Sequence, residues 1–188
     1  MFVHKDAADT YGWTKLDALK NFPFIHVDDP IIRSAIRYKA MDRATLLKRM
    51  VALVGVVDTN SAEELAGEKF GLVFDGLTDS AEHAIACFAA TKQGLRFLAF
   101  SPFEDERSMT AAEHIDFLDM VLSQYGLMGW NKVQVHRHES TVGYMRKSMS
   151  QENLEVIIFL KLSWDLVTFA DVSKAILESR SNTDAEQE

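Results

Sequence analysis

The chain has 188 residues, of which 47% are apolar and 26% charged, a composition that excludes a disordered protein and suits one soluble domain with a small annex. Its net charge of −8 argues against a dedicated nucleic-acid-binding module, which is expected to be strongly basic. The longest apolar run, Val156 to Leu160, is too short to span a bilayer, and the single cysteine, Cys87, excludes an internal disulfide.

Residues 1–67 are expected to form a helical N-terminal annex. Thr14 to Asn21 favours a short helix. Asp28-Asp29-Pro30 is typical of a helix start, because proline is favoured at the first helical position. The apolar residues from Leu46 to Val57 recur at helical spacing and predict a longer helix.

Residues 68–180 are expected to form the core. Three short apolar runs separated by turn residues predict an antiparallel meander of three strands, at Phe70 to Phe74, His83 to Ala90 and Leu95 to Phe100. The strand at Phe70 to Phe74 is expected to end in an Asp75-Gly76 turn. A capping box at Thr110 to Glu113 then starts a helix that continues to Tyr125. That helix is expected to lead to a fourth strand near Lys132 to His136, parallel to the first.

The remaining pattern is less regular. Thr141 to Met149 favours a helix, and Phe169 to Ser179 favours another. Glu155 to Leu160 fits a strand or a buried helix, since its period does not decide between them. Residues 181–188 are polar and are expected to be a disordered tail. The order of three strands, a helix, a strand and a helix predicts an α/β (α+β) fold with a ribonuclease-H-like mixed sheet, although many α+β domains share this order.

One segment resembles the catalytic domain of hAT-type transposases. Lys69 to Thr78 followed by Glu82 to Ala89 is similar to the family pattern FGLIFDGWT…EHYIAVFA, and the Phe-Asp-Gly-x-Thr motif is its most specific part. The resemblance extends over roughly Thr10 to Ser150. Its other matching elements are Tyr11-Gly12-Trp13, Phe22-Pro23-Phe24, Arg43 to Leu47, and Ala111 to Leu122 with His114. The resemblance implies a ribonuclease-H-like core derived from a transposable element.

The resemblance also implies a site. Transposases of this kind cleave and join phosphodiesters with two Mg²⁺ or Mn²⁺ ions held by carboxylates. Asp75 matches the first carboxylate, after the first strand. The position of the second carboxylate matches Arg137, whose fixed positive charge repels a metal ion. Asp75 is therefore expected to be vestigial, and replacement of the lost ligand by Glu139 or Asp79 stays open.

Further departures from the family pattern point the same way. Leu77 stands where the family has tryptophan, and Ile157 and Leu160 align with its Cys-x-x-His segment. The chain is expected to stop before the family's inserted helical domain is complete. It is also expected to lack the N-terminal zinc finger and the C-terminal dimerisation segment, which leaves its oligomeric state open. The resemblance thus implies a degenerate domain that has no catalytic activity and binds no cofactor. If the domain is active instead, Mg²⁺ or Mn²⁺ is the expected cofactor.

Basic residues between Arg33 and Arg49 indicate where DNA would bind, if it binds. Arg43, Lys48 and Arg49 on the predicted helix are the best candidates, and the expected binding is weak and salt-dependent. An ordinary solvated helix face explains the same charges. Two other functions stay open: a metal-dependent nuclease or transposase that uses Asp75 with an atypical partner, and an interaction or regulatory protein. No signal-peptide or membrane-spanning pattern is visible, so nucleus or cytoplasm is expected and a membrane partner is not.

Overall fold

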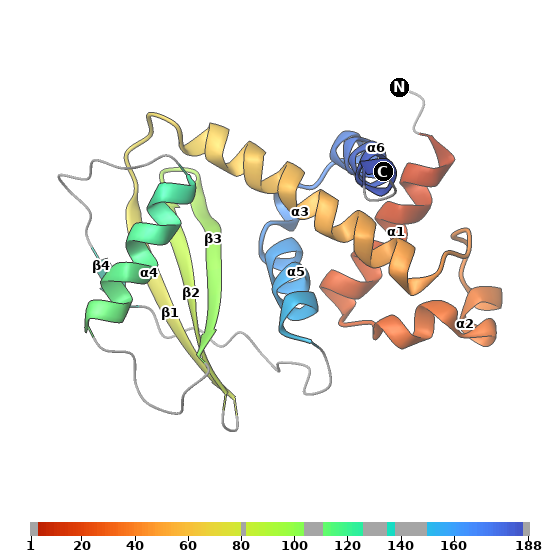
Figure 1. Cartoon of the computed structure of the whole chain (residues 1–188), viewed down its shortest axis with the longest axis horizontal. Helices are drawn as coiled ribbons and strands as arrows, with labels where there is room; N and C mark the ends of the chain where they lie inside the picture. Colours follow the sequence, from red (N-terminus) through yellow and green to blue (C-terminus); the bar gives the residue numbers. More distant parts are fainter. Residues whose placement is uncertain (1–3, 80–81, 104–110, 126–134, 138–149, 186–188) are drawn as a thin grey trace. The chain divides into compact units, whose positions relative to one another are not determined.

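The computed structural model describes residues 4–79, 82–103, 111–125, 135–137 and 150–185 (Figure 1). Within these ranges, only the backbone is described at 75–79, 82–84, 101–103, 111–114, 135–137, 151 and 182–185. The chain divides into two compact units, a helical unit of Met1–Thr59 with Glu155–Glu188 and a sheet unit of Asn60–Leu154. The predicted α+β class is confirmed. The division differs from the expected one, because the sequence placed residues 68–180 together in the core, whereas 155–188 belong with the N-terminal helices.

The helical unit begins with α1, Lys5–Lys20. Its N-cap is His4, whose Nδ1 accepts the backbone N–H of Asp6 at 3.4 Å. The helix ends at Asn21, which adopts the left-handed conformation with φ of 51°. The sequence predicted only the C-terminal part of this helix, from Thr14.

Short helices follow before the long one. The 3-10 helix η1 covers Phe24–Asp28, and α2 covers Pro30–Ala35. α2 begins at Pro30, as the sequence predicted, and Asp29 caps it, since its Oδ1 accepts the N–H of Ile31 at 2.7 Å. The predicted long helix is also confirmed, as α3, Arg43–Leu65.

The chain completes the helical unit with α5, Gln151–Leu162, the 3-10 helix η2, Trp164–Leu166, and α6, Phe169–Ala185. The segment that fitted a strand or a helix is therefore helical. The helix predicted to end at Ser179 continues for six more residues, so residues 181–185, expected to be disordered, are the last turns of α6. α6 packs against α1.

The sheet unit contains three antiparallel strands, β1 Gly71–Asp79, β2 Glu82–Thr91 and β3 Gly94–Phe103, which confirms the predicted meander. After α4, Ala111–Gln124, a short strand β4, Val135–Arg137, pairs with β1 in parallel, as predicted. The sheet order is β3-β2-β1-β4. The helix predicted at 141–149 lies outside the described residues.

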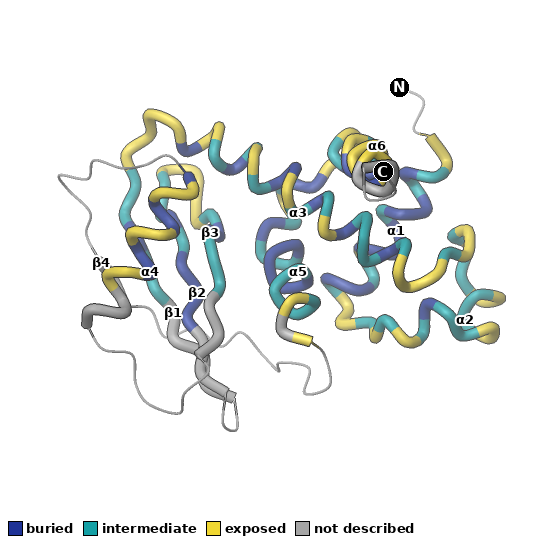
Figure 2. The backbone as a smooth tube through the Cα atoms, viewed as in Figure 1, coloured by how far each residue is buried: buried dark blue, intermediate teal, exposed yellow. Residues whose placement is uncertain are grey.

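The core of the sheet unit lies between the sheet and α4. The buried residues of this core on β1, β2 and β3 are Leu72, Ile85, Cys87, Ala89 and Leu98, and those on α4 and just after it are Phe117, Leu118, Val121, Leu122 and Tyr125. Figure 2 shows α4 with buried positions on one side and exposed positions on the other. The hydroxyl of Tyr125 donates to the Leu98 carbonyl at 2.9 Å, which ties the end of α4 to β3. No helix in the described ranges is long and apolar enough to cross a bilayer.

Candidate functional site

Asp75 lies inside β1 and not in a turn. The strand continues to Asp79, and the backbone of Asp75 pairs with Ala86 of β2. The predicted Asp75-Gly76 turn is therefore wrong, because the pairing with β2 extends β1 through both residues. This removes the simplest structural reason for an aspartate at this position, which was turn formation.

Arg137, the residue aligned with the second carboxylate, is the last residue of β4 and pairs with Phe74. Because Phe74 directly precedes Asp75, the backbones of positions 75 and 137 lie on adjacent strands, one register step apart. The side chains of Asp75 and Arg137 are outside the described part of the structure. The register alone thus brings the two aligned positions together.

The two alternative carboxylates differ in position. Asp79 is four residues beyond Asp75 on the same strand, which separates their backbones by about 13 Å at roughly 3.3 Å per residue. Metal ions in two-metal sites are only about 4 Å apart, so Asp79 is badly placed to share ions with Asp75. Glu139 lies outside the described residues. Over the ranges that the structure describes, no three or more His, Cys, Asp or Glu residues form a group that would hold a metal ion.

Cys87 is fully buried in the core of the sheet unit. Burial raises the pKa of its thiol to about 12, so it carries no thiolate at neutral pH. It therefore acts as a small apolar side chain and not as a nucleophile or a ligand.

The arginines proposed to contact DNA form ion pairs within the helical unit. Arg33 and Arg43 both pair with Asp28, at 3.0 and 2.5 Å. Arg49 pairs with Asp6, and its side chain is only 12% exposed. Lys48 is half-buried on α3. Asp28 and Asp6 thus partly offset the charges of these arginines, which leaves less positive charge for a phosphate backbone.

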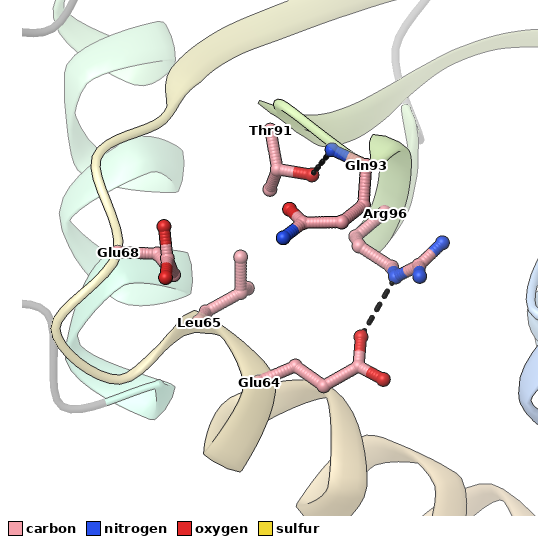
Figure 3. A pocket seen from close by; sticks show the side chains of 6 residues that line it. All are labelled: Glu64, Leu65, Glu68, Thr91, Gln93 and Arg96. Atoms are coloured by element: carbon pink, nitrogen blue, oxygen red, sulfur yellow. Dashed lines mark hydrogen bonds and ion pairs between the residues drawn. The ribbon is translucent and has the colours of Figure 1, made fainter.

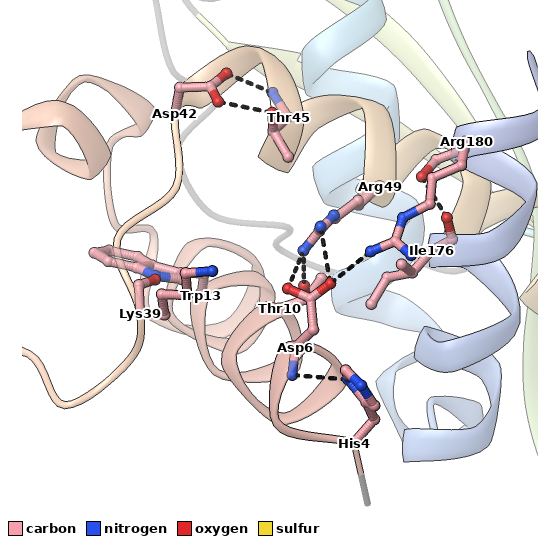
Figure 4. Close-up of polar contacts among 11 residues, drawn as sticks. His4, Asp6, Thr10, Trp13, Lys39, Asp42, Thr45, Arg49, Ile176 and Arg180 are labelled. Carbon is pink, nitrogen blue, oxygen red and sulfur yellow. Dashed lines mark hydrogen bonds and ion pairs between the residues drawn. The ribbon is translucent and has the colours of Figure 1, made fainter. Parts of the chain in front are cut away.

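One polar centre was missed by the sequence patterns (Figure 4). Both oxygens of Asp6 accept hydrogen bonds from Arg49, each at 3.1 Å, and Oδ2 also accepts one from Arg180 at 3.0 Å. Arg49 donates in addition to the hydroxyl of Thr10 at 2.7 Å. The centre joins α1, α3 and α6. No local sequence pattern predicts it, because Asp6 and Arg180 are 174 residues apart.

Each unit contains a cavity lined by residues that the structure describes. One, of about 240 Å³, is in the sheet unit, between the end of α3 and the β2–β3 hairpin. Its polar lining includes Gln93, Glu68 and the ion pair between Glu64 and Arg96, whose Oε2 and Nε are 2.9 Å apart (Figure 3). The other, of about 260 Å³, is in the helical unit between the start of α1 and the middle of α6, and its lining includes Asp6.

Comparison with family models, curated proteins and solved structures found no match.

Proposed function

We propose that the sheet unit is a transposase-derived ribonuclease-H-like domain that does not cleave DNA. The observation that carries the proposal is the pairing of β4 with β1, which places Arg137 beside Phe74 and next to Asp75 in register. The strand order β3-β2-β1-β4, with the first three strands antiparallel and β4 parallel to β1, is compatible with that fold. The resemblance of the Phe-Asp-Gly-x-Thr segment to hAT transposases supports the proposed family, and the register supports the alignment of position 137.

Charge explains why this arrangement is inactive. A two-metal site must neutralise two close cations with several carboxylates. In the proposed alignment Asp75 is the one matching ligand, and an arginine takes the place of another. At an effective dielectric of about 20, a positive charge about 4 Å from a metal ion adds roughly 4 kcal/mol of repulsion before solvent screening. Stable occupancy by two ions is therefore not expected.

A nicking assay on supercoiled DNA with Mn²⁺ tests the proposal. We expect no metal-dependent nicking by the full chain, and the same background from Asp75→Ala. Arg137→Asp alone is not expected to restore activity, because the family's third carboxylate is still unmatched. Nicking that disappears in Asp75→Ala, but persists in the matched control Asp119→Ala on the exposed side of α4, would establish a nuclease instead.

Residual DNA binding belongs to the same proposal and is expected to be weak or absent. The net charge is −8, and Arg43 and Arg49 already pair with Asp28 and Asp6. Any binding of a labelled duplex should fall steeply with salt and should weaken in Arg43→Ser and Lys48→Ser. Binding that neither salt nor these substitutions reduce would exclude an electrostatic mode on α3.

A further inference from the structure

The cavity of the helical unit combines an apolar lining with a charged one. Ala7 and Ile176 are almost fully buried in its wall, and Leu177 is 64% exposed beside them. His4, Asp6 and Arg180 supply the polar part. An apolar surface with a few convergent polar groups at one end is the usual design of a small-molecule site.

The charges around the polar lining residues do not cancel. The single carboxylate of Asp6 serves two guanidinium groups, those of Arg49 and Arg180. Arg49 is 12% exposed and holds Asp6 from the interior, whereas Arg180 is 62% exposed and contacts only Oδ2. One positive charge is therefore left over at the cavity, on the more exposed arginine. The N-terminal end of α1 adds partial positive charge at the same place.

We propose that this cavity binds a short aliphatic carboxylate, with the carboxylate on Arg180 and the carbon chain against Ala7, Ile176 and Leu177. A guanidinium group binds a carboxylate with paired hydrogen bonds, and Arg180 keeps N–H groups beyond the one given to Asp6. The volume of about 260 Å³ is below the range of drug-sized pockets, which limits the ligand to a short chain. This inference concerns the helical unit and does not depend on the function proposed for the sheet unit.

Titration of the ¹⁵N-labelled full chain with hexanoate, acetate and hexanol tests separately whether the carboxylate and the carbon chain of the ligand contribute to binding. Hexanoate is expected to shift the amide signals of the first turn of α1 and of residues 173–180. Each buried methylene strengthens binding by about fourfold, so acetate should bind at least tenfold more weakly. Hexanol, which lacks the charge, should also bind at least tenfold more weakly.

Matched variants on α6 locate the charge. Arg180→Ala is expected to weaken hexanoate binding at least tenfold, whereas Lys174→Ala, which removes the same charge from the same helix outside the cavity lining, should leave it unchanged. Arg180→Lys should bind with intermediate affinity. Leu177→Ser should lower the affinity for hexanoate towards that for acetate. Thermal unfolding is used to check that each variant is folded, which is expected for Arg180→Ala because the Arg180 side chain is 62% exposed.

Three results would overturn the proposal. Equal affinities for acetate and hexanoate would mean an adventitious ion only. Equal weakening by Arg180→Ala and Lys174→Ala would mean a general effect of surface charge. Absence of any saturating shift with hexanoate would also reject the site.

Discussion

Asp6 is a carboxyl whose ionisation is coupled to the folding of the helical unit. Burial alone would raise the pKa of this carboxyl, but the hydrogen bond and charge of Arg49, with the charges of Arg180 and Lys39, lower it below its ordinary 3.8. A carboxylate with a depressed folded-state pKa stabilises the folded state fully above its unfolded pKa. That stabilisation is lost as the pH falls through the lower folded value.

We therefore predict that the wild type loses more stability than Asp6→Asn between about pH 5 and pH 2, measured by urea unfolding at each pH. Asp42 has a lowered pKa too, because of hydrogen bonds from Thr45, but it titrates in both proteins and cancels in the comparison. Parallel pH profiles for the two proteins would show that the ion pairs of Asp6 do not stabilise the fold.

Two threonines on α1 make a matched pair. Both are almost fully buried, but the hydroxyl of Thr10 accepts a hydrogen bond from Arg49, whereas Thr14 Oγ1 has no hydrogen-bond partner among the described residues. A buried polar group without a partner costs about 1–3 kcal/mol. Thr14→Val is therefore predicted to stabilise the protein by about 1 kcal/mol, and Thr10→Val to destabilise it by about 1–3 kcal/mol. Urea unfolding measures both, and the opposite order would contradict the assigned contacts.

At the scale of elements, the segment between α2 and α3 is tied to α1 by close packing. The indole N–H of Trp13 donates to the Lys39 carbonyl at 3.0 Å. The ring of Tyr38 lies so near Gly12 that an added Cβ would be 2.3 Å from its Cζ atom. Glycine is thus needed inside this helix, in spite of its low helix propensity, to let the ring approach.

Gly12→Ala is predicted to lower the free energy of unfolding by about 1–3 kcal/mol through overpacking. The control is Gly55→Ala on α3, where an added Cβ meets nothing within 4 Å. There the higher helix propensity of alanine should stabilise the protein by about 0.5–1 kcal/mol. Equal effects of the two substitutions would show that Tyr38 does not pack on Gly12.

The packing of α4 on the sheet can be tested with a buried and an exposed residue of that helix. Leu122 is 1% exposed and Met120 is 58% exposed on the same helix. Leu122→Ala is predicted to cost about 2–5 kcal/mol because it leaves a cavity in the core. Met120→Ala should change stability by less than about 0.5 kcal/mol. A similar cost at both positions would mean that α4 is rotated from the orientation described here.

The sequence predicted those elements whose local patterns are distinct. The strands β1 to β3 are short apolar runs between turns, and α4 has a clear apolar side. α5 was left undecided because Ile157, Ile158, Phe159 and Leu160 are all buried, so no period is visible. The first half of α1 was missed because Thr10 and Gly12 are weak helix formers, and tertiary packing overrides that preference.

At the scale of the whole molecule, the two units are predicted to lose structure separately. Ala175 is 1% exposed on α6, so Ala175→Asp places an unpaired charge in the interior of the helical unit. Hydrogen exchange followed by mass spectrometry should then speed up in α1 and α6, while the amides of β1, β2 and β3 remain protected. Equal loss of protection in the sheet would show that the molecule unfolds as one unit.

The candidate sites were predictable only in part. The family resemblance singled out Asp75 and Arg137, and backbone pairing places these two positions on adjacent strands. The Asp6 centre and the cavity beside it were not predicted, because they join the two ends of the chain. The local pattern of a single sequence does not predict a contact between residues as distant as Asp6 and Arg180.

The contact between α1 and α6 has a consequence for the order in which the protein folds during synthesis. The residues of α1 leave the ribosome before the sheet unit does, but α6, the helix on which they pack, is made after the sheet unit. Residues 60–154 are complete well before that. On the growing polypeptide the sheet unit can therefore fold early. The apolar side of α1 stays exposed to solvent until α6 has been made. A nascent chain arrested before α6 would be the form most exposed to chaperones and proteases.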